Sequence, residues 1–267
     1  MFYLPFGYYY AVRLGTVPKL LSWMLIYIMP TAFYSWLTYE GAWLPFIANY
    51  LLVLLAVFSL YELGYIFNDT VAIHHEQQPA IRLYNYNFAH FDRYSWWIIT
   101  VRITYAVLAL LCLALNCSPQ SWSFWLVCVD VATILPIFTL YNRWRSKNNV
   151  WLYPILVLSR YLPFMLLYRI DGWAILLLWL SFPLLNWLER FSMPVYRFPF
   201  MQRLIPNERS KTIFRVAYYV VLFILSALFC PPQISHLYFL PIDILCCYRL
   251  ILYFYTLHHN PKNYLNG

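Results

Sequence analysis

The chain has 267 residues, of which 63% are hydrophobic and 10% are charged, and its mean hydropathy is positive. A soluble domain of this length carries about 25% charged residues, so the composition excludes a soluble globular protein and predicts a chain that lies in a lipid bilayer. The formal net charge of +8 is expected for loops beside anionic headgroups. Nucleic acid is therefore not an expected partner.

Eight apolar stretches are long enough to cross a hydrocarbon core of about 30 Å, which takes about 20 helical residues. Each is predicted to be a helix, because a spanning segment must satisfy its own backbone hydrogen bonds. Their centres lie near Ile28, Leu54, Ala106, Ala132, Leu158, Leu178, Leu222 and Leu250. The sequence predicts an all-α, polytopic helix bundle that forms one membrane domain, residues 1–267. Residues 1–19 have no leading cationic stretch and no cleavage site, and are predicted to be a mature interfacial segment.

Basic residues gather in alternate loops of this arrangement. They are Arg13 and Lys19, Arg82 and Arg93, Arg143, Arg145 and Lys147, the cluster from Arg190 to Lys211, and Lys262. The opposite loops carry almost none beyond Arg169. The positive-inside rule therefore places both termini and the long loops, residues 68–94 and 189–212, on the cytoplasmic side.

Ionisable residues inside spans are costly, and they mark a site, a pathway or a buried pair. The set is Glu62, Arg102, Asp130, Arg160, Asp243 and Arg249. Arg102 with Asp130, and Asp243 with Arg249, are candidates for ion pairs that join helices. Arg160 is expected to meet either an acid such as Asp130 or the phosphate of a substrate.

The stretch FNDTVAIHHEQQPAIR, residues 67–82, is the longest polar interruption in the first half of the chain. Glu62, Asp69, Ala72 and Glu76 fall along one helical face if the second helix continues past Asn68. Carboxylates that converge at a helix end suit Mg²⁺, which binds one or two carboxylates, waters and substrate phosphate. The alternative is an ordinary polar loop with capping Asn and Asp residues.

Within this stretch, GYIFNDTVAIHHE resembles the first acidic motif, N-D-x-x-D-x-x-x-D, of the UbiA superfamily of intramembrane prenyltransferases. Asn68 and Asp69 match its first two positions, and Glu76 replaces its last Asp. Ala72 stands at the position of the middle Asp. The resemblance therefore includes two acids of this motif and lacks one.

Two later segments are similar to the same family and follow in the same order. LYNRWRSKNNVWLYPILVLSRYL resembles the Tyr-x-x-x-Lys-Arg loop and the apolar helix after it. NWLERFSM stands in the place of a second motif, D-R-x-x-D. There Glu189 and Arg190 match the first two residues, and Met193 replaces the final acid.

The resemblance implies a UbiA-like bundle of about eight to nine transmembrane helices in a bacterial inner membrane. It also implies an isoprenoid lipid substrate whose diphosphate is held by Mg²⁺ at a cytoplasmic active site. Carried onto this chain, the catalytic candidates are Asp69, Glu76 and Glu189, and the metal ligands are these three with Asn68. The phosphate-binding candidates are Arg82, Arg143, Arg145, Lys147, Arg160 and Arg190, and the further candidates are Glu62, His74, His75 and Asn186.

Three functions stay open at this point. The first is prenyl transfer from a polyprenyl diphosphate to an acceptor. The second is transfer of phosphoribose to a polyprenyl phosphate, because a branch of the family has an Arg inside the fifth helix and an Arg-aromatic-small pattern after the sixth. Arg160 and the run 190–192 fit that pattern. The third is a non-catalytic or transporter-like protein. The absence of acids at Ala72 and Met193 favours this function.

Overall fold

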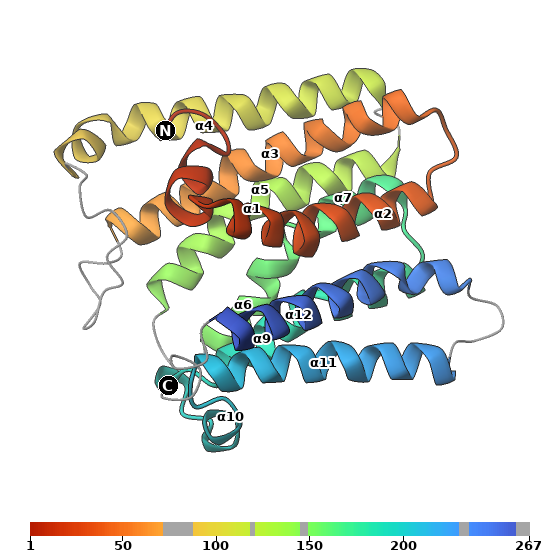
Figure 1. Ribbon diagram of the computed structural model, residues 1–267. Coiled ribbons are helices and arrows are strands. Elements are labelled where there is room, and N and C mark those ends of the chain that lie inside the picture. The colour runs from red at the N-terminus through yellow and green to blue at the C-terminus, as the bar shows by residue number, and fades with distance from the viewer. Residues whose placement is uncertain (72–87, 118–120, 145–148, 230–234, 260–267) are drawn as a thin grey trace.

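The computed structural model describes residues 1–71, 88–117, 121–144, 149–229 and 235–259. Within these ranges the ordered elements are all helical, as the sequence predicts (Figure 1). The first half comprises η1 (Tyr9–Leu14), α1 (Val17–Trp23), η2 (Met24–Ile28), α2 (Met29–Leu37), α3 (Trp43–Thr70), α4 (Phe88–Asn116) and α5 (Trp122–Arg143). The second half comprises α6 (Asn149–Leu158), α7 (Leu162–Tyr168), α8 (Gly172–Ser181), α9 (Pro183–Phe191), η4 (Pro194–Tyr196), α10 (Pro199–Leu204), α11 (Glu208–Phe229), η5 (His236–Phe239) and α12 (Leu240–His259).

By length and composition, six continuous helical stretches of the described chain can cross a membrane. They are 17–37, 43–70, 93–116, 122–143, 208–228 and 236–258. Two further pairs, α6 with α7 and α8 with α9, are each bent by about 40° and bring the number to eight if each pair is one span. Each of the eight predicted centres falls within one of these stretches or pairs. The predicted apolar helices are therefore present, and two of them are bent; the number of spans is six to eight.

Proline accounts for the position of both bends. Pro163 lies in the first turn of α7 and Pro183 in the first turn of α9, where the missing N–H does not break a helical hydrogen bond. Backbone carbonyls left open at the breaks are bound by tyrosine hydroxyls. Tyr27 donates to the Arg160 carbonyl at 2.7 Å, and Tyr219 donates to that of Ser181. Such side-chain donors make a broken helix tolerable at membrane depth.

One end of the bundle collects the helix ends that the charge pattern assigns to a single side (Figure 1). α3, α5, α9 and α12 end there, and α4, α6 and α11 begin there. The turn between α2 and α3 lies at the opposite end, as do the starts of α5 and α12. The alternation of basic and nonbasic loops therefore matches the arrangement of the helices, whereas the side of the membrane that each end faces stays a prediction.

The core of the first half forms where α3 packs along α4 and α5. Gly64 permits close approach at one point, because a Cβ atom there would lie only 2.1 Å from the ring of Phe138 on α5. Residues 1–14 fold back onto this core, and Phe2 and Tyr8 are buried. The predicted interfacial segment therefore has a well-packed inner face.

The predicted loops need correction at their ends. Residues 68–70 belong to α3 and residues 88–94 to α4, while 72–87 lie outside the described residues. The segment 189–212 is also largely helical, since it contains the end of α9, then η4 and α10, and the first turn of α11. Tyr196, Phe198 and Met201 explain the difference, because they pack against a small cluster with Val150 and Phe191.

Candidate functional site

A pocket of about 440 Å³ lies between the end of α9 and the start of α11. Its lining contains three basic side chains and two acidic ones, so it is polar and carries a small excess of positive charge. The lining residues are Asn186, Glu189, Arg190, Ser192, Met193, Pro194, Ile205, Pro206, Asn207, Glu208, Lys211 and Arg215. Three predicted site residues, Asn186, Glu189 and Arg190, are therefore brought together.

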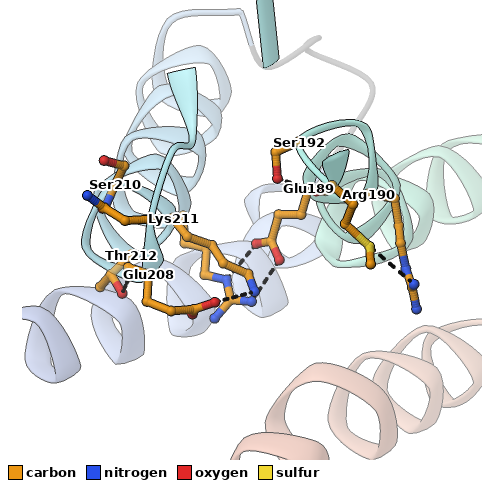
Figure 2. Close-up of polar contacts among 10 residues, drawn as sticks. Glu189, Arg190, Ser192, Glu208, Ser210, Lys211 and Thr212 are labelled. Carbon is orange, nitrogen blue, oxygen red and sulfur yellow. Dashed lines mark hydrogen bonds and ion pairs between the residues drawn. The ribbon is translucent and has the colours of Figure 1, made fainter. Parts of the chain in front are cut away.

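The pocket residues of α11 are held by a capped helix start. The Asn207 side-chain oxygen accepts the backbone N–H of Ser210 at 2.8 Å, as an N-cap residue does. Lys211 and Arg215 then follow four residues apart, so they lie on the same face of α11. This face is turned toward α9 (Figure 2).

Glu189 forms the central ion pair of the site. Its two carboxylate oxygens accept hydrogen bonds from Nε and Nη2 of Arg215 at 2.5 and 2.7 Å, and the Glu189 side chain is 8% exposed. A two-point contact of this kind fixes the guanidinium plane as well as its position. Sequence reasoning missed Arg215. The available signal was an arginine inside an apolar run, four residues after Lys211.

Arg190 points away from Glu189 and from α11 (Figure 2). Neighbouring residues on a helix differ by about 100° in direction, so only one of the two can face α11. The Arg190 guanidinium lies over the ring of Tyr153 on α6, 4.2 Å from its centre. Asn186 reaches the same tyrosine and donates a hydrogen bond to its hydroxyl at 2.5 Å. Of the residues predicted on α9, Glu189 therefore faces α11, whereas Asn186 and Arg190 contact Tyr153 of α6.

Arg249 on α12 is a further cation, and it is buried. It is 8% exposed, and its Nε donates no hydrogen bond within the described part of the chain. Its guanidinium lies within electrostatic range of Arg215 and Glu189. Two arginines therefore interact electrostatically with one buried carboxylate, and only Arg215 forms an ion pair with it.

Asp69 belongs to a different group of contacts, at the end of α3. Its Oδ2 accepts hydrogen bonds from the Tyr8 hydroxyl at 2.8 Å and from Arg13 Nη2 at 2.6 Å. Asn68, the predicted neighbouring ligand, donates to Asp69 Oδ1 at 3.0 Å. The N-terminal segment therefore supplies the cation that pairs with the first predicted metal ligand.

Glu62 lies two turns before Asp69 and is fully buried. It pairs with Arg102 of α4, so the expected Arg102–Asp130 pair is wrong. The physical reason is that α4 packs along α3, which brings Arg102 to Glu62. Glu62 also accepts the backbone N–H groups of Phe6 and Tyr9 at 2.8 and 2.7 Å.

The remaining intraspan residues do not form the other expected pair. Asp243 and Arg249 are six residues apart on α12, so they point to different sides of the helix. Within the described residues, neither Asp130 nor Asp243 forms an ion pair. Arg160 lies at the break between α6 and α7, where its guanidinium is 5.2 to 5.6 Å from the ring centres of Tyr27, Tyr61 and Tyr161. Tyrosine faces therefore surround this buried cation.

The other predicted site residues are placed as follows. Arg143 is the exposed last residue of α5. His74, His75, Glu76, Arg82, Arg145 and Lys147 lie outside the described residues. Among the residues that are described, no three His, Cys, Asp or Glu side chains come together as metal ligands, and Asp69 and Glu189 each pair with an arginine. This donor set does not fit Mg²⁺ by itself, so the metal stays a prediction that depends on Glu76.

Comparisons with protein-family models, with curated proteins and with solved structures found no match to this chain. Function is therefore inferred from the residues and contacts of the chain itself. The α9–α11 pocket is the strongest candidate site, because it combines a cavity, several cations and a fixed guanidinium at the end of membrane-spanning helices.

Proposed function

We propose that the chain is an integral membrane transferase that acts on a polyprenyl phosphate or diphosphate bound in the α9–α11 pocket. The observation that carries the proposal is the Arg215–Glu189 pair with Lys211 beside it, in a polar pocket at the end of the spans. A lipid whose phosphate lies in the headgroup region can bring that phosphate to the pocket while its tail remains among acyl chains. The sequence resemblance to prenyltransferase motifs supports the same substrate class.

Each pocket residue has a defined role in this proposal. Glu189 holds the Arg215 guanidinium, and Arg215 and Lys211 donate hydrogen bonds to phosphate oxygens. In prenyl transfer the bond between the allylic carbon and the diphosphate oxygen breaks, and both electrons leave with the diphosphate. Cations fixed beside that oxygen stabilise the growing negative charge more than they stabilise the bound substrate. The acceptor then forms a bond with the allylic carbon and releases a proton.

Phosphoribosyl transfer to a polyprenyl phosphate is a second candidate. It is favoured by Arg160, which lies buried at the break in the fifth span with no ion pair among the described residues. Both reactions use a phosphorylated lipid, and they differ in the donor compound.

A transporter-like function is a third candidate. Its specific support is the pair of bent spans, α6 with α7 and α8 with α9, because transporters often bind substrate at discontinuous helices. A protein of this kind would bind the lipid phosphate and leave its covalent structure unchanged.

The experiment uses the purified protein in lipid nanodiscs. Radiolabelled polyprenyl phosphate or diphosphate is supplied with candidate acceptors or with phosphoribosyl diphosphate, with and without Mg²⁺, and products are separated by thin-layer chromatography. Binding of the labelled lipid is measured in parallel. Arg215→Ala and Lys211→Ala should each weaken binding by about 10- to 100-fold, as expected for lost hydrogen bonds to a charged group.

Arg93→Ala is the matched control, because Arg93 is exposed in α4, which begins at the same end of the bundle (Figure 1), and it does not line the pocket. Lys211→Ala is the variant less prone to misfolding, since Lys211 is partly exposed and pairs with the exposed Glu208, so its loss leaves the Glu189–Arg215 pair intact. Binding without turnover by any donor would support the transporter-like candidate. Equal lipid binding by all three variants and the unmodified protein would overturn the pocket assignment.

A further inference from the structure

The segment 193–206, which joins α9 to α11, presents large apolar side chains outward. Met193, Val195, Phe200 and Leu204 are 41%, 54%, 75% and 45% exposed. Large apolar groups gathered on a short segment indicate a surface that something apolar covers. The segment begins two residues after one helix of the bundle ends and stops just before the next begins.

The opposite side of the same segment is fixed to the bundle. Tyr196 is buried in a small cluster with Val150 and Phe191. Phe198 packs against that cluster, and its ring lies 4.6 Å from the ring of Phe191. The outward apolar side chains are therefore held in place by an inner anchor, and cannot all turn inward.

Two cations accompany the outward apolar residues. Arg197 and Arg203 are both exposed, and within the described part of the chain neither forms an ion pair. Long basic side chains beside apolar ones are typical of segments that lie in the membrane interface, with the apolar groups at the acyl boundary and the cations among the headgroups.

The position of the segment in the bundle also fits the membrane interface. α10 lies at the end of the bundle where α9 ends and α11 begins, and it projects beyond the neighbouring helices (Figure 1). Because α9 and α11 both belong to candidate spans, a segment only a few residues from their ends lies close to the headgroup layer. A lipid surface can therefore reach both the apolar residues and the arginines.

We propose that the segment 193–206 is a binding surface for anionic lipid headgroups, with Phe200 and Leu204 inserted at the acyl boundary and Arg197 and Arg203 paired with headgroup anions. The proposal does not depend on the transferase function. It also indicates the depth of the α9–α11 pocket relative to the membrane. The pocket is lined by residues from both ends of the segment, namely Met193, Pro194, Ile205 and Pro206. The pocket mouth would then lie at headgroup depth.

The test places the photoreactive residue benzoylphenylalanine at position 200, where an exposed phenylalanine already stands. The full-length protein is reconstituted in nanodiscs of phosphatidylcholine with about one-quarter phosphatidylglycerol. After illumination, lipid adducts are identified by intact-protein mass spectrometry. We expect lipid adducts, with phosphatidylglycerol enriched at least roughly threefold over its share of the bilayer, because each nearby basic residue attracts anionic lipid.

Arg197→Asn together with Arg203→Gln, in the same labelled protein, should return the adduct ratio to the bilayer composition. Asn is chosen at position 197 because that residue has a φ of 55°, a left-handed conformation that Asn tolerates. The matched control carries the probe at Trp122, which is 80% exposed at the opposite end of the bundle. The two substitutions should leave the adduct ratio there unchanged.

Three outcomes would overturn the proposal. One is the absence of lipid adducts at position 200 while adducts form at position 122. Another is cross-linking of position 200 to a second copy of the chain, which would make the segment a protein interface. The third is enrichment of phosphatidylglycerol that is unaffected by the arginine substitutions.

Discussion

At the residue scale, the Glu62–Arg102 pair joins α3 and α4 through two side chains that are both fully buried. Removing one member leaves an uncompensated charge inside the bundle. Arg102→Met should therefore lower the free energy of unfolding by about 3–5 kcal/mol. Thermal unfolding in detergent, followed by tryptophan fluorescence, measures the loss. Arg93→Met on the same helix is the control, because Arg93 is exposed and its loss should change stability by less than about 0.5 kcal/mol.

The double variant Glu62→Met/Arg102→Met separates the cost of an unpaired buried charge from the cost of altered packing. Replacing both charges with apolar groups of similar volume avoids the unpaired charge, so the double variant should be more stable than Arg102→Met alone. A double variant that is no more stable than the single variant would contradict this account of the pair.

Residue partners were the part of the structure that the sequence predicted least well. The sequence marks Glu62, Arg102, Asp130 and Arg160 as intraspan ionisable residues, and the cost of burying a charge makes that identification dependable. The choice of partner depends on which helices touch and on how each is rotated. Arg102 could face Asp130 or Glu62 by sequence alone, and only the packing of α4 along α3 selects Glu62.

At the element scale, the N-terminal segment is held by side chains of α3 and α4. Glu62 accepts the N–H groups of Phe6 and Tyr9, and Arg102 Nε donates to the Phe2 carbonyl at 2.8 Å. In Glu62→Met/Arg102→Met these contacts are lost while the charges remain balanced. Amides of residues 6–9 should then exchange with deuterium roughly tenfold faster, since each lost hydrogen bond contributes about 1 kcal/mol.

Hydrogen–deuterium exchange with mass spectrometry measures this effect on the peptide that covers residues 1–14. A peptide from α5 serves as the internal control and should keep its exchange rate, because α5 does not bind the segment through these groups. Unchanged exchange of residues 6–9 would show that other contacts, such as those of Tyr8 and Arg13 with Asp69, hold the segment by themselves.

Helices were largely predictable from the sequence, because a long apolar run that crosses a bilayer must satisfy its own backbone hydrogen bonds and therefore forms a helix. Pro163 and Pro183 mark the bends after Leu158 and Ser181 as places where a helix can kink, but the sequence alone does not say which of its prolines bend a helix. A proline at membrane depth can sit in a straight or a bent helix, depending on which groups bind the freed carbonyls. The tyrosines that bind them at these breaks come from distant helices.

At the scale of the whole molecule, the helix ends divide between two sides, and this division can be tested by labelling. Arg143 ends α5 and is exposed, and Glu40 is exposed in the turn between α2 and α3. In sealed vesicles, a membrane-impermeant maleimide should reach Arg143→Cys and Glu40→Cys from opposite sides. Inverted vesicles should expose Arg143→Cys if the positive-inside rule sets the orientation.

The unmodified protein gives the background from the native cysteines, of which Cys112 and Cys247 are exposed within spans. Labelling of both introduced cysteines from the same side would contradict the arrangement of the bundle. Labelling from opposite sides in the reverse sense would keep the arrangement and reverse its orientation.

Part of the candidate site was predictable from the sequence, because the positions of the helix ends were. Asn186, Glu189 and Arg190, which were site candidates from the sequence, lie at the end of a span and line one pocket; their role in a site stays a prediction. Arg215 and Arg249 come from two later helices, and no local pattern connects them with Glu189. Their positions depend on how α11 packs against α9 and how α12 packs against α11.

The Glu62–Arg102 pair also bears on how the chain enters the membrane. On the scale of translocon insertion, an ionised residue such as Arg at the centre of a single span costs about 2.5–3.5 kcal/mol. The carboxylate and the guanidinium offset each other only when α3 and α4 lie side by side in lipid. The hairpin of these two helices is therefore the smallest part of the chain in which neither charge faces hydrocarbon alone.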